Sequence, residues 1–485
     1  MISKAEPAGW CSMMTNMLYT VVMNIDVQTR NTRLLYKPLV LLNEVYTEKT
    51  MFRLPFSLIP NYSSFAEIIE YLKKEKIIKE IYFLPTRQDV LPHVSILIQS
   101  TNEVTGGSMT AIKGNEKESL SIAIGEALER HFLSSSTLSK TVTKNITHSD
   151  PLLSHLINFP SFIPEQKDLY SKISSTSPHF FTCVEVSSLM NDTKKWLPSQ
   201  YIFWKDPHDE VALVNSTTNG AGGHFTKEAA ILSGLSEEIE RDTFLLHWLA
   251  KKTPLKIDLY TLQNKELKKN IEELQAKGIH IYILYLENDF NIPVFVSLLF
   301  DKRTSPFALS IGCSVKVTSH ERAIHNALCE SISVLTMNLS HDGPRRKSGD
   351  TAPFSDITIT RNERILMWYG DHIERDIDFF LQGKVVDLST LPIYTGKSDS
   401  YSLLNYMIKK LQEKNISDIL YYEVNSGHLK KIGYHVVKVV VPEFLQLYLK
   451  ENLATLSSPR LAHALGKSRN TMKLSDLNLI PHPFP

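Results

Sequence analysis

One short pattern occurs twice in this chain of 485 residues and constrains its fold more than any other feature. The sequence reads EALER at residues 126–130 and EEIER at residues 237–241. Because residues three and four apart share one face of an α-helix, each copy places two carboxylates and one guanidinium on a single helical surface. The four carboxylates are those of Glu126, Glu129, Glu237 and Glu240.

The residues around the pattern leave two interpretations open. An apolar stripe occupies another face of each segment, which is typical of a surface helix whose Glu and Arg side chains pair in solvent. The stripes consist of Leu120, Ile124 and Leu128 and of Ile231, Leu235 and Ile239. Since stripe, carboxylates and arginine recur in the same phase, the two polar faces can instead line one cleft. Carboxylate oxygens in such a cleft bind hard divalent cations, and magnesium bridging a nucleotide is the natural candidate.

The overall composition points away from nucleic acid and membranes. Lys and Arg total 53 and Asp and Glu total 52, so no basic field attracts DNA, RNA or anionic lipid. No segment approaches the ~20 consecutive apolar residues of a membrane span. The four cysteines show no paired spacing of the kind found in zinc sites or disulfide frameworks. We therefore expect reduced thiols and a cytoplasmic protein.

Alternating strand-like and helix-like segments predict the α/β class, with mixed sheets and packed helices. We expect a small α/β N-terminal region over residues 1–100, with partner docking as a candidate role, and a main domain over residues 101–485. The expected helices lie near residues 65–76, 118–134, 226 onwards, 262–276, 319–339 and 402–414. The expected strands lie near residues 18–25, 80–84, 94–98, 180–186, 200–204, 211–214, 279–286, 293–300, 419–424 and 434–441.

A glycine-rich segment, NGAGGHFT, runs from Asn219 to Thr226 directly before the second glutamate helix. With Thr226 as N-cap, the helix start offers free backbone N–H groups to a phosphate, with Asn219 and Gly222 in the loop. An ordinary glycine turn is the alternative, and the Walker A pattern is absent. Lys113, in AIKGN ahead of the first glutamate helix, is either a surface lysine or a phosphate contact.

The chain ends in PHPFP, in which Pro481, Pro483 and Pro485 alternate with other residues. Alternating prolines fix φ and favour an extended polyproline II tail, which can enter a groove at little entropic cost. A frayed terminus is the alternative. The sequence has no GxSxG elbow, no HExxH and no HxE…CxxC pattern, so it gives no support to a hydrolase or a zinc enzyme.

Together these features resemble the YcaO family, in particular the ATP-dependent cyclodehydratases that form azoline heterocycles in ribosomal peptides of the thiazole/oxazole-modified microcin type. AIKGNEKESLSIAIGEALER is similar to the family's lysine-glycine segment and first ExxER helix. TTNGAGGHFTKEAAILSGLSEEIERDTF resembles its STNG-type loop and second ExxER helix, and PHPFP resembles the PxPxP signature of azoline-forming members. The resemblance extends from about residue 106 to residue 485.

The resemblance implies an ATP-binding fold in which the four glutamates hold Mg²⁺ on the nucleotide phosphates. It also implies that the tail prolines position the reacting amide. The residues that it assigns to nucleotide binding are Lys113, Asn219, Gly222, Arg241 and Glu330. The chain departs from the family pattern in the third helix, where Asn326 and Ser333 replace an arginine and a glutamine. It departs again before the second ExxER, where Ala229 replaces an acidic residue and Glu228 lies one position early.

The chemistry implied by the resemblance is backbone heterocyclisation. A Cys, Ser or Thr side chain of a precursor peptide attacks the preceding amide carbonyl, ATP phosphorylates the resulting oxyanion, and elimination gives thiazoline or oxazoline. The implied partners are the precursor peptide, an E1-like leader-binding protein and an FMN-dependent azoline dehydrogenase. Two alternatives remain: a YcaO-type thioamide- or amidine-forming enzyme, and a non-catalytic scaffold that presents a peptide.

Overall fold

The computed structural model divides the chain into two units, residues 1–49 and 50–485. The structure describes residues 52–53, 63–84, 90–91, 93–100, 105–112, 116–138, 141–147, 149–169, 180–204, 210–303, 307–339, 345, 354, 359 and 361–484. All of these residues belong to the second unit. The expected strand at 18–25 and two predicted site residues, Lys113 and Pro485, lie outside the described residues.

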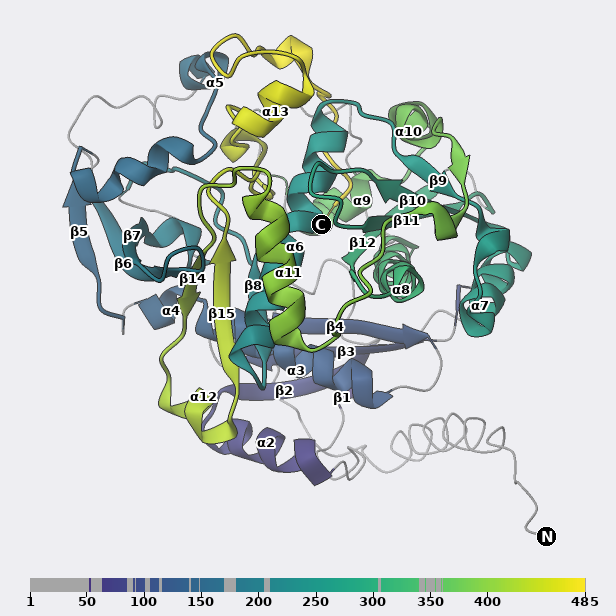
Figure 1. Cartoon of the computed structure of the whole chain (residues 1–485). Helices are drawn as coiled ribbons and strands as arrows, with labels where there is room; N and C mark the ends of the chain where they lie inside the picture. Colours follow the sequence, from purple (N-terminus) through teal and green to yellow (C-terminus); the bar gives the residue numbers. More distant parts are fainter. Residues whose placement is uncertain are drawn as a thin grey trace. The chain divides into compact units, whose positions relative to one another are not determined.

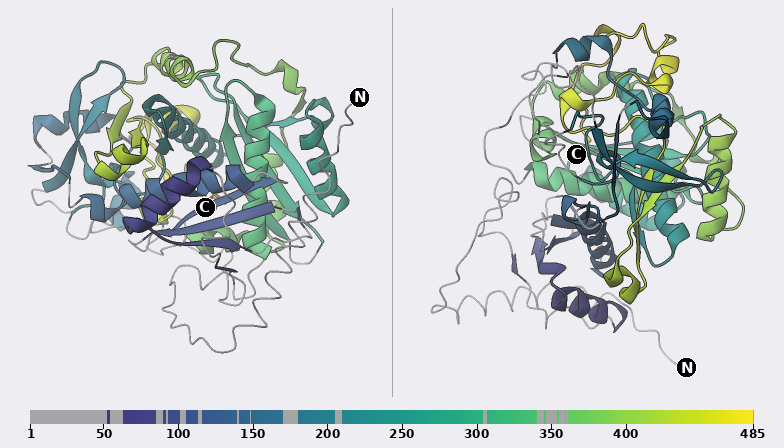
Figure 2. Two further views of the ribbon diagram at one scale, coloured as in Figure 1. Left: turned by 90° about the horizontal axis from the view of Figure 1, so that it is seen from below. Right: turned by 90° about the vertical axis from the view of Figure 1, so that its left-hand side faces the viewer.

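The first sheet is four-stranded and antiparallel, with the order β1-β2-β3-β4. Its strands are β1 (Phe52–Arg53), β2 (Ile78–Leu84), β3 (His93–Ser100) and β4 (Thr105–Ile112). Helix α2 (Ser63–Lys74), purple in Figure 2, contacts β2, and α3 (Glu116–Phe132) packs on β3 and β4. The predicted stripe of α3 is buried in this core. The pairing of β3 with β4 crosses residue 100, so a continuous sheet joins the two expected domains.

The second sheet has six strands in the order β5-β6-β14-β15-β8, with β7 paired to β6. Its strands are β5 (Lys144–Thr147), β6 (Phe180–Ser188), β7 (Lys194–Pro198), β8 (Ala221–His224), β14 (Leu420–Glu423) and β15 (His435–Val440). Because β8 is the last strand in this order, the glycine-rich segment forms a sheet edge. That edge contacts α3 and α6 (Lys227–Leu249), the two ExxER helices.

The third sheet has five strands and forms the most deeply buried part of the core. Its order is β12 (Ala308–Val315), β11 (Val294–Asp301), β10 (Ile279–Leu286), β9 (Leu255–Ile257) and β13 (Val385–Val386). Every residue of β11 and β12 is buried, which explains their continuous apolar sequence. Helix α7 (Lys265–Ala276) contacts β10, and α8 (His320–Leu339) packs on β11 and β12.

Helix α6 connects the second and third sheets, since it packs on β8 and β15 and also on β12. Helix α11 (Ser400–Gln412) covers α6 beside β15 in Figure 1. The remaining helices are α4 (Ser135–Leu138), α5 (Pro164–Leu169), α9 (Arg361–Met367), α10 (Ile373–Leu381), α12 (Gly427–Ile432) and α13 (Pro459–Ala464). The predicted mixed α/β class is confirmed. Within the described ranges, no helix combines the length and apolar character needed to cross a bilayer.

Two predicted strands, at 200–204 and 211–214, are wrong. Residues 199–201 form a turn of 3₁₀ helix, and 211–214 contains no strand. The buried amide of Gln200 explains both differences. Its Nε2 donates to the carbonyl oxygen of Val211 at 2.9 Å, and its Oε1 accepts from the N–H of Leu213 at 2.9 Å. A side chain therefore satisfies backbone groups that a neighbouring strand would otherwise pair.

Candidate functional site

Two adjacent glycines in β8 bring the ExxER helices close to one strand. Successive residues of a strand point to opposite faces. A Cβ on Gly222 would lie 2.1 Å from the backbone oxygen of Ala230 in α6, whereas one on Gly223 would lie 2.9 Å from Oε1 of Glu129 in α3. A side chain at Gly222 would clash with the backbone of α6, and one at Gly223 would displace the side chains of Glu129 and Tyr434. The glycine-rich sequence therefore serves close packing on both sides of β8.

The carboxylates of both helices are bound to this glycine segment. The N–H of Gly220 donates to Glu237 Oε2 at 3.1 Å, and the N–H of Gly223 donates to the carboxylate of Glu129. Glu126, which pairs with Arg130, repels both Glu129 and Glu237 electrostatically. The polar faces of α3 and α6 thus lie together, as the shared-cleft interpretation requires. They do not face solvent on separate surfaces.

Arg241 lies among the acids of α6 and α8. Its guanidinium is 3.6 Å from Glu237, 3.5 Å from Glu240 and 3.9 Å from Glu330. The edge strand β12 holds two of these acids in place. The N–H of Val315 donates to Glu240 at 2.6 Å, and the N–H of Cys313 donates to Glu330 at 2.8 Å. Helix α6 therefore meets β12 and α8, which follow it by about sixty residues or more, at this arginine.

The acids carry more negative charge than their neighbours balance. Burial raises the pKa of Glu129 to about 8, with Glu237 and Glu126 adding to the effect. Burial also raises the pKa of Glu240 to about 8, which Arg241 opposes and Glu330 reinforces. Protein interiors oppose such unbalanced charge, so the carboxylates favour either protons or added cations. We call the group Glu126, Glu129, Glu237, Glu240, Arg241 and Glu330 the acidic cluster.

The acidic cluster fits Mg²⁺ that is shared with a phosphate better than a metal held by protein alone. Among the described residues, no three His, Cys, Asp or Glu side chains are close enough to hold a metal ion by themselves. Mg²⁺ usually takes one or two carboxylates and completes its shell with phosphate oxygens and water. Two buried polar atoms, Asn219 Oδ1 and Arg241 Nε, also have no hydrogen-bond partner within the part of the chain that the structure describes. An unpaired buried polar atom is costly, which favours a bound ligand that pairs with it.

The C-terminal tail reaches the acidic cluster. The ring of Phe484 stacks on the Arg241 guanidinium, with 3.8 Å from the guanidinium carbon to the ring centroid. Pro481 and Pro483 are buried. Trp248 of α6 donates to the carbonyl oxygen of Ile480 at 2.9 Å. Residues 481–484 are therefore docked rather than frayed, which decides between the two sequence interpretations of this segment.

His482 and Phe484 escaped the sequence analysis, which considered only the prolines of the tail. His482 is fully buried and contacts the carbonyl oxygen of Tyr448 through Nε2 at 2.8 Å. Arg364 donates to the carbonyl oxygen of His482 at 3.1 Å. Burial and the charge of Arg364 hold the pKa of His482 well below its usual range. A histidine and a phenylalanine between prolines give no local signal of such contacts.

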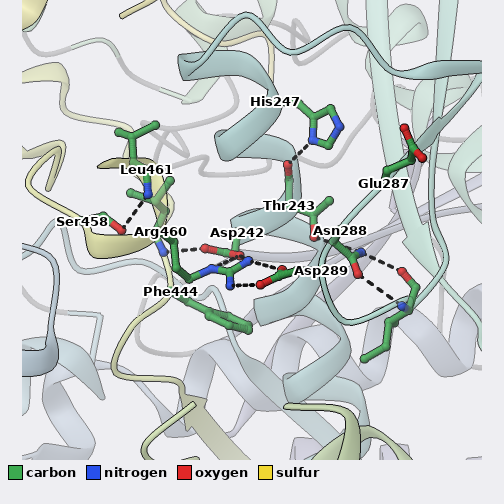
Figure 3. Close-up of polar contacts among 12 residues, drawn as sticks. Asp242, Thr243, His247, Glu287, Asn288, Asp289, Phe444, Ser458, Arg460 and Leu461 are labelled. Atoms are coloured by element: carbon green, nitrogen blue, oxygen red, sulfur yellow. Dashed lines mark hydrogen bonds and ion pairs between the residues drawn. The ribbon is translucent and has the colours of Figure 1, made fainter. Parts of the chain in front are cut away.

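A buried ion-pair network fixes the turn of α6 that follows Arg241. Arg460 Nε donates to Asp242 at 3.0 Å, and its two Nη atoms bind Asp289 in a bidentate pair at 3.0 Å (Figure 3). The other Asp242 oxygen accepts from the N–H of Leu445 at 2.9 Å. The guanidinium also lies 5.2 Å from the ring centroid of Phe444. This network joins the C-terminal segment to α6 beside the acidic cluster.

Two of the departures from the family pattern, Asn326 and Ser333, lie on α8 about one turn from Glu330, and Ser333 is buried. Ala229 is buried in the first turn of α6, where its N–H donates to the N-cap Thr226, and Glu228 is exposed to solvent. The described residues retain the four carboxylates and Arg241 around the glycine segment alongside these departures.

Comparison with known proteins identifies the family. Residues 113–445, more than half of the chain, match the family described as YcaO cyclodehydratase, ATP- and Mg²⁺-binding. An uncharacterised protein of Methanothermobacter thermautotrophicus is 23% identical over 349 residues, which cover 71% of this chain and 84% of that protein.

Three solved structures share the fold. A heterocyclase in complex with substrate and cofactor has a TM-score of 0.68 at 17% identity and covers 86% of this chain. YcaO from Methanopyrus kandleri bound with AMPPCP and Mg²⁺ has a TM-score of 0.57 at 16% identity, covering 85% of this chain and 97% of that one.

The third is the E. coli microcin synthetase McbBCD complex, one chain of which has a TM-score of 0.54 at 17% identity and covers 84% of this chain and 96% of its own. This chain spans only 57% of the length of the heterocyclase, so the likeness concerns part of that protein. The family match together with the shared fold shows that the chain belongs to the YcaO family of ATP- and Mg²⁺-binding cyclodehydratase enzymes.

Proposed function

We propose that the protein converts Cys, Ser or Thr residues of a ribosomal precursor peptide to thiazoline or oxazoline, with ATP as co-substrate. The observation that carries this proposal is the stack of Phe484 on Arg241, which joins the proline-rich tail to the acidic cluster. A tail at this position can align a peptide amide beside the γ-phosphate. A heterocyclase solved with substrate and cofactor and the microcin synthetase McbBCD complex have similar folds, which supports this proposal.

The reaction balances without an oxidant. The side-chain thiol or hydroxyl gives up its proton to solvent as its sulfur or oxygen bonds to the preceding carbonyl carbon, and the resulting oxyanion accepts the γ-phosphoryl group, which releases ADP. The C–O bond then breaks, phosphate leaves, and loss of the amide proton gives the C=N bond. Bound Mg²⁺ would neutralise phosphoryl charge, with Glu126, Glu129, Glu237 and Glu240 as its proposed ligands. Arg241 supplies a fixed positive charge, and Phe484 holds its orientation.

Partners are part of the same proposal. The precursor peptide is the substrate, an E1-like protein binds its leader, and an FMN-dependent dehydrogenase oxidises azolines to azoles. The described part of residues 1–100 contributes β1, β2, β3 and α2, which form a layered surface that we propose as the docking region for the leader-binding protein. Lys113, Asn219, Gly222 and Glu330 are proposed nucleotide contacts, and Pro481, Pro483 and Pro485 are proposed to position the amide.

Neutralising the carboxylates tests the proposal directly. We expect Glu126→Gln and Glu240→Gln each to lower ATP-dependent loss of water from the precursor by at least about a hundredfold, because each removes a proposed metal ligand. Mass spectrometry of the peptide, with ATP, magnesium and the partner protein present, measures the conversion. Glu272→Gln, at an exposed position of α7, is the matched control and should retain wild-type conversion.

The product mass separates an azoline former from a thioamide former, and ATP hydrolysis separates an enzyme from a scaffold. Azoline formation removes one water per residue, whereas thioamide formation exchanges oxygen for sulfur, and amidine formation joins an amine with loss of water. A scaffold would show no ATP hydrolysis above background with peptide and partner present. Wild-type conversion by both Glu126→Gln and Glu240→Gln would refute the assigned metal ligands.

A further inference from the structure

A lysine occurs in the middle of the most apolar strand of the second sheet. Lys438 lies in β15, where the sequence reads HVVKVV, and only 4% of its surface is exposed. Lysine is almost never buried without partners, because removing an ammonium group from water is costly. The neighbours of Lys438 should therefore explain its presence. They come from the segment Thr217–Gly220 at the edge of the acidic cluster, which we call the Thr217–Gly220 loop.

The ammonium group of Lys438 binds two carbonyl oxygens of this loop. It donates to Thr217 at 2.8 Å and also to Asn219. Two carbonyl groups of one short loop therefore point toward the same buried cation. The N–H of Val439 adds a hydrogen bond to the carbonyl oxygen of Gly220 at 2.8 Å. Three hydrogen bonds from Lys438 and Val439 of β15 thus fix the backbone of the loop.

A buried carboxylate holds the side chain of the same loop. Glu238 is fully buried, and its Oε1 accepts from Asn219 Nδ2 at 2.8 Å. Burial raises the pKa of Glu238 and lowers that of Lys438, and the opposite charge of each partner opposes these shifts. Each charge is therefore stabilised by the other. Glu238 belongs to the EEIER pattern but is separate from the acids around Arg241.

This arrangement determines which groups of the loop remain available. With Nδ2 bound to Glu238, the Asn219 amide is held in one orientation, and its Oδ1 has no partner within the described ranges. Gly220, at φ +80°, directs its N–H to Glu237. No side chain fits at Gly220, since a Cβ there would lie 2.3 Å from the carbonyl oxygen of Val439. The loop thus carries one unpaired acceptor, Asn219 Oδ1, beside the residue that binds Glu237, a proposed metal ligand.

We propose that Lys438 and Glu238 are positioning residues for Mg²⁺-nucleotide. Lys438 fixes the backbone of the Thr217–Gly220 loop, and Glu238 orients the Asn219 amide so that Oδ1 stays free as an acceptor for the bound complex. This inference rests on the proposed function only in placing the nucleotide at the acidic cluster. Neither residue needs to contact ATP or the peptide.

Calorimetric titration of the full chain with AMPPCP and Mg²⁺ tests this role without the peptide or the reaction. We expect Lys438→Met to weaken binding about tenfold and to raise the KM for ATP by a similar factor, with kcat within about twofold of the wild type. Lys431→Met, at an exposed position of α12, is the matched control and should bind like the wild type.

Substitutions of Glu238 provide a second test of the positioning role, which applies even if Lys438→Met does not fold. Glu238→Gln keeps an acceptor for Asn219 Nδ2 and should bind AMPPCP within about threefold of the wild type. Glu238→Ala releases the amide and should lose about tenfold. Equal binding by folded Lys438→Met and the wild type, or equal loss in both Glu238 variants, overturns the proposal. If the wild type binds AMPPCP but never dehydrates a precursor, the proposed function fails and the positioning role stands.

Discussion

The residues of the site differ in whether the surrounding sequence predicts their contacts. The spacing of Glu126, Glu129, Glu237 and Glu240 was sufficient to predict two pairs of carboxylates on helical faces, because helical geometry is local. Phe484 could not be predicted to stack on Arg241, since that contact joins positions more than two hundred residues apart. Contacts of this kind depend on the packing of the whole chain, and a single sequence does not encode them in any short pattern.

The histidine of the tail predicts a loss of stability in acid. His482 is buried with a lowered pKa, so the folded chain keeps it neutral while the unfolded chain takes up a proton below about pH 6.5. The contribution of His482 to stability is therefore retained above pH 6.5 and falls below it by about 1.4 kcal/mol per pH unit, whereas the raised pKa values of Glu129 and Glu240 act in the opposite direction. Urea titrations at pH 7 and pH 5 measure the free energy of unfolding.

His482→Gln should shrink this pH dependence, because glutamine keeps a donor near Tyr448 but takes up no proton. His463→Gln, at an exposed position of α13, should leave the difference between pH 7 and pH 5 unchanged. An identical pH dependence in wild type and His482→Gln would contradict the prediction.

The elements were predicted well wherever local chemistry defines their ends. Thr226 caps α6 as expected, and Asn264 caps α7 by accepting from the N–H of Leu267, which places the start of α7 three residues after the expected position. The failures at 200–204 and 211–214 have one cause: the amide of Gln200 bonds to backbone groups eleven and thirteen residues away. β-propensity cannot reveal a side chain that takes the place of a strand.

The network of Arg460 predicts that removing the arginine costs more stability than removing the charge of Asp289. Arg460→Met leaves Asp242 buried without its cation and should lower the free energy of unfolding by about 3 kcal/mol or more. Asp289→Asn removes a partner whose side chain is half exposed, so its effect should stay below about 1 kcal/mol. Chemical denaturation of both variants measures the difference. Similar losses of unfolding free energy in the two variants would show that the ion pair with Asp242 is not the main stabilising contact of Arg460.

At the scale of the described unit, the fold class followed from sequence, but the arrangement of three sheets did not. Nothing local indicates that β8 lies against both α3 and α6, or that β12 supplies N–H groups to Glu240 and Glu330. The pairing of strands from separate parts of the chain, such as β8 with β15, is set by long-range packing. The in-phase repeat of the ExxER pattern offered convergence of the acids as one of two interpretations, and the family resemblance favoured it.

The acidic cluster joins α3, α6 and α8, so we expect a ligand bound there to stabilise all of residues 50–485. Mg²⁺ with AMPPCP at a hundredfold excess over Kd should add about 2.7 kcal/mol to the free energy of unfolding. AMPPCP with EDTA should add much less, because without the cation the phosphates meet uncompensated carboxylates. Thermal unfolding followed by circular dichroism measures the shift. Glu240→Gln should reduce it, and an equal shift with EDTA would exclude a role for the metal.

The stack of Phe484 on Arg241 has a consequence for synthesis of the protein. Domains generally assemble as the polypeptide leaves the ribosome, earliest segments first. Arg241 emerges long before the aromatic ring that covers it, and the ring is still inside the exit tunnel when the helices have already formed. A nascent chain consequently holds its arginine uncovered until this phenylalanine has left the ribosome.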